Sequence, residues 1–571
     1  ALDITDFWRE SIAAALRVWH IILGFFVPLV LSCCLDSFFV PDKSKISLPF
    51  AGVSLALFSA LYFSEVAYIN GFRDKTYEYT PYFYYTYLQN DLEQSYHYFG
   101  IINTTRLDFK QLLFGAPEYL IQADDLNVSG SDYHRSDGES DDGWNVMDLD
   151  FEKASASTDS VKLKHLDTYF SNMQPTRRNQ YTGMFKGKNL IFLTLEGFSD
   201  KVIDPEFTPT LYKMSTEGFV FRNYYNSVWG GSTGSGEYAN MTGNIYLNSS
   251  CLKKSGDTYQ PFALGNQFSA LGYRTLAYHN HTYTYYGRNL SHPNFGYEWK
   301  AIGNGLVLQS ENWPNSDKEL AEATVGDYAG IDRPFHVYYM TVSGHCNYSF
   351  SGNMMSTRHR YDLPEKYKSD SAEVRAYRAC QYEVELMLRV LVDELDKAGK
   401  LENTVFAMTA DHYPYALSNS SLAELYGLNA SGIRGNPELY RNGFILWSPS
   451  MKEPVTVDTP CSAIDILPTL SNLFALEYDS RLMMGTDILA DGEHIVPLKM
   501  DGWSWISTQG EYRCYNSRFY PNEKCTLGSD EMKDYVDTVN RMILAKITYS
   551  KNLLDYDYYG HIFGKQHNYD N

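Results

Sequence analysis

Short, continuous apolar runs alternate with amphipathic stretches from about residue 188 onward. This alternation predicts buried strands connected by crossover helices, the pattern of a largely parallel sheet. Runs with the length of a buried strand lie at 189–195, 336–342, 404–410 and 443–448. Helical spacing of apolar positions predicts helices at 372–400, 462–474 and 529–555. Residues 181–510 are therefore expected to form one α/β domain, a mostly parallel sheet flanked by helices.

The N-terminal part has a different pattern, with two long apolar stretches at roughly 19–35 and 46–66. The second has about the length that crosses a hydrocarbon core of ~30 Å, and the first is close to the minimum. Residues 1–70 are therefore predicted to form two transmembrane helices at the end of a membrane domain; a buried helical hairpin in a soluble domain is the alternative. Lys43 and Lys45 lie between the stretches, so the positive-inside rule predicts a cytoplasmic loop there and an outside location for the residues after about 70.

Two further segments flank the predicted α/β domain. Residues 71–180 are expected to connect it to the membrane, first as an aromatic-rich amphipathic stretch along the membrane surface. A polar, acidic stretch at 127–160 then has the composition of a linker or mobile loop. Residues 511–571 are predicted to form a C-terminal segment with one helix and a polar tail rich in Tyr and His.

Charge and cysteine content exclude some classes of function. The formal net charge of −21 argues against a nucleic-acid partner, because binding a phosphate backbone needs a basic face. A single anionic headgroup could still bind if a metal and a few local cations supplied the attraction. The eight cysteines show no CxxC pairing, which argues against a structural zinc site. Cys514 and Cys525 lie on either side of a Pro-Asn turn, and whether they form a disulfide is left open.

Chemically active residues follow three of the predicted strands. The first strand runs into Glu196, the second reaches His345, and the third runs into Asp411-His412. Ligands of open α/β sheets bind outside the carboxyl ends of the strands, so these residues are expected to converge on one crevice. A glycine-rich loop, GGSTGSGE, precedes a helix-like run and carries Thr233, where a hydroxyl could face both the backbone N–H groups of a helix start and a ligand.

Glu196, Asp411, His412 and the Thr233 hydroxyl form an oxygen-rich set with one nitrogen. Such a set suits Mn²⁺ or Mg²⁺, with Zn²⁺ as an alternative. A metal on the threonine oxygen would lower the pKa of the hydroxyl and stabilise charge on a transferring phosphoryl group. Each residue alone has an ordinary structural explanation, such as a helix cap or a flexible turn. The combination predicts a metal site to which the threonine hydroxyl could contribute.

Six motifs occur in order along the chain: LTLEGFSD, TPTLYKMSTEGFVFRNYYN, GGSTGSGEY, TADHYPYAL, AIDILPTLSNLF and LMMGTDIL. Together they resemble the lipoteichoic acid synthase branch of the sulfatase-like, alkaline-phosphatase-like superfamily, over roughly residues 185–500. The resemblance implies a sulfatase-like fold preceded by transmembrane helices. It also implies a bacterial, multi-pass protein of the cell membrane whose catalytic domain is extracellular.

The resemblance assigns roles to individual residues. It implies that Glu196, Thr233, Asp411 and His412 bind the metal, usually Mn²⁺, and that Thr233 is the nucleophile. It further implies a substrate-binding role for His345, and contact with a phosphoglycerol headgroup for His279, Tyr286 and Arg288. Arg288 would suit a phosphate clamp, because guanidinium pairs bidentately with phosphate oxygens.

Three departures from the family pattern lie around the expected substrate pocket. Tyr286-Gly287 stands where family members commonly have Trp-Asn, and Ser232 precedes the nucleophile where some members have lysine. After His345 the chain has Cys346-Asn347-Tyr348 in place of an aromatic residue, a proline and a phenylalanine. The resemblance is therefore closer at the metal site than in the pocket.

By the same resemblance, the expected reaction moves glycerol phosphate from phosphatidylglycerol to Thr233, releasing diacylglycerol. An acceptor hydroxyl then takes the group, on a glycolipid or a growing polyglycerolphosphate chain such as lipoteichoic acid. The alternatives are a phosphoglycerol transferase acting on another surface glycan, a phosphoethanolamine transferase and a non-enzymatic binder. A sulfatase is a further alternative, although GSTGSGEY lacks the proline and arginine of the formylglycine setting.

Overall fold

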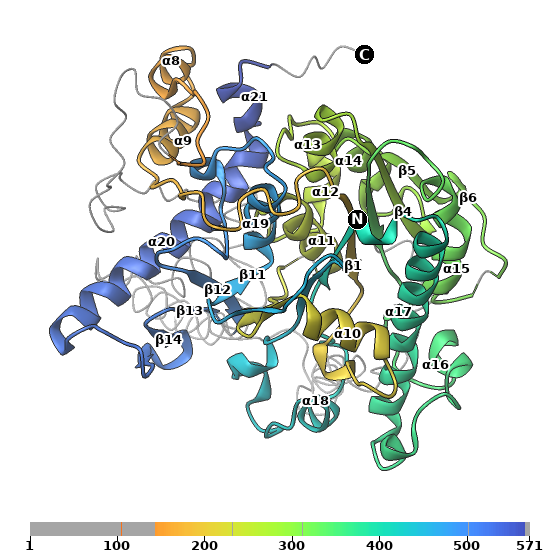
Figure 1. Cartoon of the computed structure of the whole chain (residues 1–571). Helices are drawn as coiled ribbons and strands as arrows, with labels where there is room; N and C mark the ends of the chain where they lie inside the picture. Colours follow the sequence, from red (N-terminus) through yellow and green to blue (C-terminus); the bar gives the residue numbers. More distant parts are fainter. Residues whose placement is uncertain (1–103, 105–142, 231, 311, 501, 566–571) are drawn as a thin grey trace, which may run out of the picture. The chain divides into compact units, whose positions relative to one another are not determined.

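The computed structural model describes residue 104 and residues 143–230, 232–310, 312–500 and 502–565 (Figure 1). The chain divides into two compact units, residues 1–78 and 79–571, and all described residues belong to the second. The predicted transmembrane helices and most of the predicted connector lie outside the described residues. Within the described ranges, no helix combines the length and the apolarity that crossing a bilayer requires.

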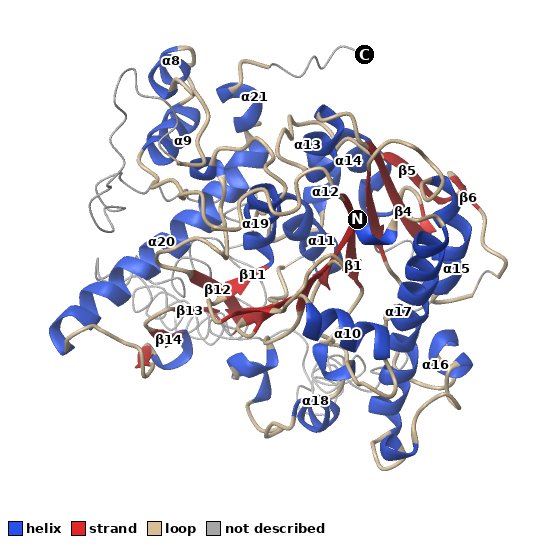
Figure 2. Cartoon of the chain, viewed as in Figure 1, coloured by secondary structure: helices blue, strands red, loops and turns tan. Residues whose placement is uncertain are grey.

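A nine-stranded sheet forms the centre of the fold (Figure 2). Its strands follow the order β10 (Val455–Val457), β2 (Phe219–Phe221), β9 (Phe444–Trp447), β8 (Thr404–Ala410), β1 (Asn189–Leu195), β7 (Phe335–Met340), β4 (Arg274–Thr282), β5 (Glu298–Ile302) and β6 (Gly305–Leu306). Every pairing in this sheet is parallel except the two that β9 makes, with β8 and with β2. The predicted mostly parallel α/β fold is therefore confirmed.

The four predicted strands are all present, and three of them occupy the middle of the sheet. Each residue of β1, β7 and β8 is buried, as expected for parallel strands covered on both faces. The register pairs Leu195 of β1 with Ala410 of β8, and Thr194 with Met340 of β7. The three strands consequently end at nearly the same level, and the residues that follow them emerge at one edge of the sheet.

Alternate residues of β1 enter two separate hydrophobic cores. Leu190 and Phe192 pack in one core, and Ile191 and Leu193 in the other. Helices contributing to the first include α11 (Ser232–Thr242), α12 (Ser250–Ser255), α13 (Leu264–Ala270), α19 (Ile466–Leu473) and α20 (Ser529–Asp555). Helix α14 (Arg288–Asn294) instead buries polar side chains. Helices contributing to the second are α10 (Pro209–Glu217), α15 (Asp317–Thr324), α16 (Met354–Arg358), α17 (Ala372–Lys397) and α18 (Asn419–Tyr426). The helices predicted at 372–400, 462–474 and 529–555 correspond to α17, α19 and α20.

A second, antiparallel sheet follows the large one in sequence. It consists of β12 (Ile495–Met500), β13 (Gly502–Ser507), β14 (Gly510–Arg513) and β15 (Arg518–Pro521). Trp505 attaches this sheet to α20, since its indole N–H donates to Asn540 at 2.9 Å. The sheet covers residues on both sides of the predicted domain boundary at 510, and that boundary stays a prediction. Cys514 and Cys525 are not joined in a disulfide.

The remaining α-helices and strands are α8 (Phe151–Ala156), α9 (Val161–Ser171), α21 (Tyr558–Ile562), and the two-stranded pair of β3 (Tyr224–Tyr225) with β11 (Cys461–Ser462). Helix α8 forms inside the stretch predicted as a linker at 127–160. Phe151 and Ala154 of this helix are buried, as are Trp144 and Leu149 just before it, so apolar side chains in this polar stretch pack against the domain.

Candidate metal and nucleophile site

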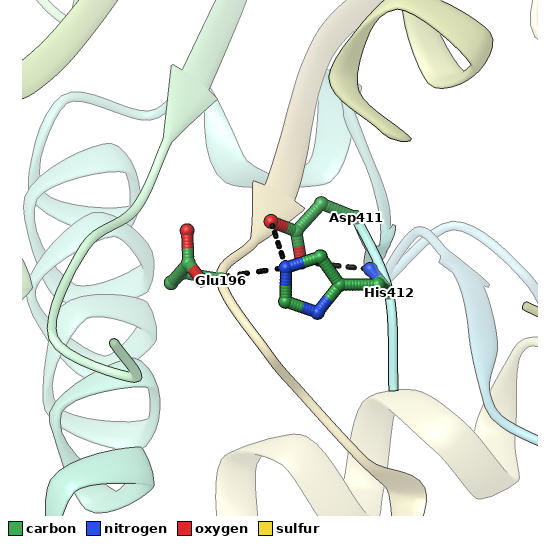
Figure 3. A group of neighbouring side chains, drawn as sticks. All are labelled: Glu196, Asp411 and His412. Atoms are coloured by element: carbon green, nitrogen blue, oxygen red, sulfur yellow. Dashed lines mark hydrogen bonds and ion pairs between the residues drawn. The ribbon is translucent and has the colours of Figure 1, made fainter. Parts of the chain in front are cut away.

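Glu196, Asp411 and His412 meet at the carboxyl edge of the sheet (Figure 3). Glu196 follows the last residue of β1, and Asp411 and His412 follow the last residue of β8. One potential ligand atom from each of the three side chains lies within 4.8 Å of the others, and all three residues are buried. The convergence predicted from the strand ends is present for these residues.

The two oxygens of Asp411 have different surroundings. Oδ1 accepts backbone N–H groups from Gly197 at 2.9 Å and from His412 at 2.8 Å. Oδ2 is buried and accepts no hydrogen bond from the described residues; it lies 3.3 Å from His412 Nε2. A buried carboxylate oxygen without a donor is costly, and a cation is the natural partner for it. The residues present therefore fit a divalent metal.

His412 presents the correct nitrogen for this role. Its Nδ1 lies 3.0 Å from the backbone oxygen of Tyr413, which can only accept, so Nδ1 carries the proton. Nε2 then has a free lone pair and lies 3.6 Å from Glu196 Oε1. A backbone carbonyl that fixes the tautomer is the usual support for a metal-binding histidine.

The pKa of Glu196 responds to its burial and to the neighbouring carboxylate. Burial and the negative charge of Asp411 hold the pKa of the Glu196 carboxyl well above its usual range. Two buried carboxylates this close repel each other unless a cation lies between them. The cluster therefore favours a bound cation over an empty, fully ionised site.

Thr233 lies in the first turn of α11, facing the same cluster. Its hydroxyl is 3.3 Å from Glu196 Oε2 and 3.4 Å from His412 Nε2. A Cβ atom added at Gly236 would lie 2.1 Å from the backbone oxygen of Asp411, so only glycine lets α11 approach the end of β8 this closely. Gly236 thus sets the separation between the threonine hydroxyl and the metal-site residues.

Arg288 is buried beside this cluster in a network that the sequence did not predict. Glu237, one turn after Thr233 on α11, accepts from Arg288 Nε at 2.9 Å and pairs with Nη2 at 2.8 Å. His292 Nε2 lies 3.4 Å from the same carboxylate. Burial alone would raise the pKa of Glu237, but Arg288 and His292 outweigh it and lower the pKa to about 2. Glu237 is consequently ionised at neutral pH.

One nitrogen of Arg288 remains unused. Its Nη1 is buried and has no hydrogen-bond partner among the described residues. The guanidinium carbon lies 5.2 Å from the ring centre of Tyr286, whose backbone adopts a left-handed conformation with φ 58°. The Arg288 charge also lowers the pKa of Glu196 against the effect of burial, which indicates that it acts on the metal site. A donor is thus held ready near the cluster for an anionic ligand.

The two remaining predicted residues are His279, in β4, and His345, in the loop after the neighbouring strand β7. His279 is buried in β4 and donates from Nδ1 to the Met340 oxygen at 2.9 Å. Burial and the nearby Arg288 charge hold the pKa of His279 well below its usual range, so its ring is neutral. His345 follows β7, with its ring centre 5.0 Å from that of Trp313.

Two supporting contacts also went unpredicted. Asp317 of α15 accepts from the Val342 N–H at 2.9 Å and from the Ser343 hydroxyl, which anchors the loop that carries His345. Ser232, where some relatives of the resembled family have lysine, places its hydroxyl 2.7 Å from the Tyr415 hydroxyl. Glu237 itself lies inside the GGSTGSGEY motif. Its position one helical turn after Thr233 was the one feature of the sequence that could have indicated a role near the site.

A metal bound by this cluster should stabilise the fold. We expect Mn²⁺ at about 100 times its dissociation constant to raise the free energy of unfolding of the metal-free protein by about 2.7 kcal/mol. Asp411→Asn should lose most of this gain, because it removes the charge from the oxygen that lacks a donor. Thermal unfolding with and without Mn²⁺ measures the effect. Asp332→Asn, at an exposed position before β7, is the matched control, and an equal Mn²⁺ shift in both variants would contradict the assignment.

Comparison with known proteins agrees with this geometry. The family model described as Sulfatase matches residues 188–476, slightly more than half of the chain. In solved structures, the chain is similar to the lipoteichoic acid synthase LtaP from Listeria monocytogenes, with a TM-score of 0.55 and 20% identity over 69% of this chain and 98% of that chain. At this identity the likeness shows the fold.

Among curated proteins, the chain is 27% identical to a lipoteichoic acid synthase of Staphylococcus saprophyticus over 69% of its own length. It is 24% identical to one from Staphylococcus aureus over 73% of its length. It spans 61% and 64% of the length of these two relatives. The matched region contains both strand ends that carry the metal-site residues, together with the helix that carries Thr233. The chain therefore belongs to the sulfatase family, and within it is similar to lipoteichoic acid synthases.

Proposed function

We propose that this protein is a metal-dependent phosphoglycerol transferase with Thr233 as its nucleophile. The observation that carries the proposal is the Thr233 hydroxyl, 3.3 Å from Glu196 and 3.4 Å from His412, at a buried cluster suited to a divalent cation. Similarity to proteins named lipoteichoic acid synthases supports phosphatidylglycerol as the donor.

The proposed metal ligands are Glu196, Thr233, Asp411 and His412, and Mn²⁺ is the proposed ion, with Mg²⁺ or Zn²⁺ as alternatives. Such an ion would lower the pKa of the threonine hydroxyl and offset negative charge on the phosphoryl oxygens. In the first step, Thr233 Oγ1 bonds to phosphorus while the bond from phosphorus to the diacylglycerol oxygen breaks. The threonine proton leaves with the diacylglycerol. In the second step, an acceptor hydroxyl oxygen bonds to phosphorus, the bond to Thr233 breaks, and the acceptor proton returns to the threonine.

Arg288, His279, Tyr286 and His345 are proposed to bind the phosphoglycerol group. Arg288 supports this role through its unused Nη1, because pairing with Glu237 fixes the plane of the guanidinium and leaves this donor unbonded. His279 is held neutral, so it can exchange a hydrogen bond with a glycerol hydroxyl without adding charge. These contacts would position the headgroup phosphorus next to the threonine oxygen.

The acceptor is proposed to be a glycolipid or the end of a polyglycerolphosphate chain, with lipoteichoic acid as the leading product. The predicted transmembrane helices at 1–70 would anchor an extracellular catalytic domain at the membrane, which suits a lipid donor because the headgroup and the site then stay near one plane. The predicted boundaries at 70, 180 and 510 belong to the same proposal.

A donor screen tests the proposal. The full chain is incubated with labelled phosphatidylglycerol, phosphatidylethanolamine or an aryl sulfate, with Mn²⁺ present and then chelated. We expect Mn²⁺-dependent release of diacylglycerol from phosphatidylglycerol and a glycerophosphate adduct on Thr233 by mass spectrometry. An ethanolamine-phosphate adduct would identify the other transferase, sulfate release would identify a sulfatase, and lipid binding without any release would identify a binder.

A further inference from the structure

A groove of about 550 Å³ lies between the α18 region and the antiparallel sheet. Its lining comes from Asn419 at the start of α18, from the loop around Ile433–Gly435 and from Arg513 and Tyr515. The lining includes two guanidinium groups and two asparagine side chains beside apolar surface. Such a surface suits an anion that also carries hydroxyl groups.

Arg434 is held rigidly in this groove without a carboxylate partner. Its Nε donates to Asn419 Oδ1 at 2.9 Å. Its terminal nitrogens reach the Tyr413 hydroxyl and the backbone oxygens of Tyr415 and Leu417, at 3.2 to 3.4 Å. All of these acceptors are neutral, so the positive charge of Arg434 is not offset by any ion pair with a described residue. In a chain of net charge −21, a fixed and uncompensated arginine on the surface favours an anionic ligand.

Arg513 approaches the groove from the other side. Its Nε donates to Glu511, which offsets part of its charge, and its guanidinium carbon lies 4.8 Å from the ring centre of Tyr520. Tyr515 is exposed, so its ring can pack against the carbon backbone of a polyol. The two arginines thus face one cavity from two different parts of the fold.

A short segment, residues 413–417, links Arg434 of the groove to the metal site. Residues 413–417 leave His412 directly, and the Tyr415 ring centre lies 4.7 Å from that of His412. The Tyr415 hydroxyl contacts Ser232, the neighbour of Thr233, while its backbone oxygen accepts from Arg434. One short segment therefore contacts both the residues around the nucleophile and the arginine of the groove.

We propose that this groove binds a phosphodiester segment of the acceptor chain, a polyol phosphate, while the terminal hydroxyl of that chain reaches Thr233. This inference rests on the proposed transferase function. Arg434 and Arg513 would contact phosphate oxygens, and Asn419 and Asn436 would contact polyol hydroxyls. The site would distinguish a chain that already carries phosphates from a neutral glycolipid.

The test compares Arg434→Gln and Asn436→Asp with Arg333→Gln. Asn436→Asp places a negative charge in the groove and keeps the oxygen that caps the Glu438 N–H, so it probes charge without touching the 413–417 segment. Arg333 is exposed just before β7, at the opposite end of the sheet from the metal site. The probe is a defined glycerophosphate tetramer, and its dissociation constant from the full-chain protein is measured beside acceptor-dependent turnover.

We expect both groove variants to bind the tetramer about tenfold or more weakly, the size of one charge-assisted hydrogen bond, with Arg333→Gln unchanged. The ratio of acceptor-dependent turnover to the initial burst of diacylglycerol should fall with it. Equal tetramer binding in all three variants would overturn the proposal. The proposal would also be overturned if the groove variants weakened only the binding of phosphatidylglycerol vesicles, because the groove would then bind a donor headgroup. Absence of the burst in the unsubstituted protein would instead refute the transferase function, a separate outcome.

Discussion

Thr233→Ala is expected to reduce release of diacylglycerol from phosphatidylglycerol by about 10³-fold or more, the scale of losing a nucleophile. The hydroxyl lies 3.3 Å from Glu196 and 3.4 Å from His412. Removing it takes away the atom that would bond to phosphorus, while the three other proposed metal ligands remain. The measurements are diacylglycerol release and the mass of the peptide that contains residue 233.

Thr233→Ser is the matched comparison, because it keeps the hydroxyl and removes only a methyl group. It should retain a measurable fraction of turnover and form the glycerophosphate adduct on the serine. Mn²⁺ should still stabilise both variants, which separates loss of the nucleophile from loss of the metal site. Normal turnover by Thr233→Ala, with no adduct in the unsubstituted protein, would refute the covalent mechanism.

Glu237→Gln is expected to lower the free energy of unfolding by about 3–5 kcal/mol, the cost of leaving a buried charge without its partner. The variant leaves Arg288 buried, with its charge uncompensated and a second nitrogen poorly bonded. Chemical denaturation at neutral pH measures the loss. Because Glu237 also fixes Arg288, the variant should raise the KM for phosphatidylglycerol as well.

The matched control for this substitution is Glu298→Gln, which breaks an exposed pair with Arg274 and should cost less than about 1 kcal/mol. The effect at Glu237 should also depend on pH. Its pKa in the folded protein is about 2, below the ordinary value of 4.5, so ionised Glu237 stabilises the fold above about pH 4.5. That contribution is lost as the pH falls toward 2, and the two proteins should converge there. A constant difference across this range would contradict the ion-pair explanation.

The sequence was sufficient to predict that Glu196, Asp411 and His412 meet, because short-range patterns place each of them at the end of a strand. The apolar runs that form β1 and β8 each stop at a charged residue, so the ends of the strands can be recognised in the sequence. Parallel pairing brings those ends to one edge of the sheet. Glu196 and Asp411 therefore had to be neighbours once the two strands paired. The direction of β9 was not predictable in the same way, since a fully apolar run looks alike in a parallel and an antiparallel strand.

The network around Arg288 could not be predicted, because it depends on how α11 packs against α14. Glu237 and Arg288 are 51 residues apart, and nothing local in either segment indicates that the two helices meet. The groove at Arg434 could not be predicted either, because it forms only where the loop before β9 meets the antiparallel sheet. The transmembrane prediction rests on residues outside the described part of the chain and stays a prediction.

The contact at Gly236 has a consequence for how the site moves. Because the backbone of α11 touches the carbonyl of Asp411, no layer of side chains lies between the helix that carries Thr233 and the strand end that carries the metal-site residues. Thermal displacement of one is then transmitted to the other, and the two behave as one rigid body. Amide hydrogen exchange should accordingly be slow both in α11 and at the end of β8. A substitution that destabilises α11 should also weaken metal binding.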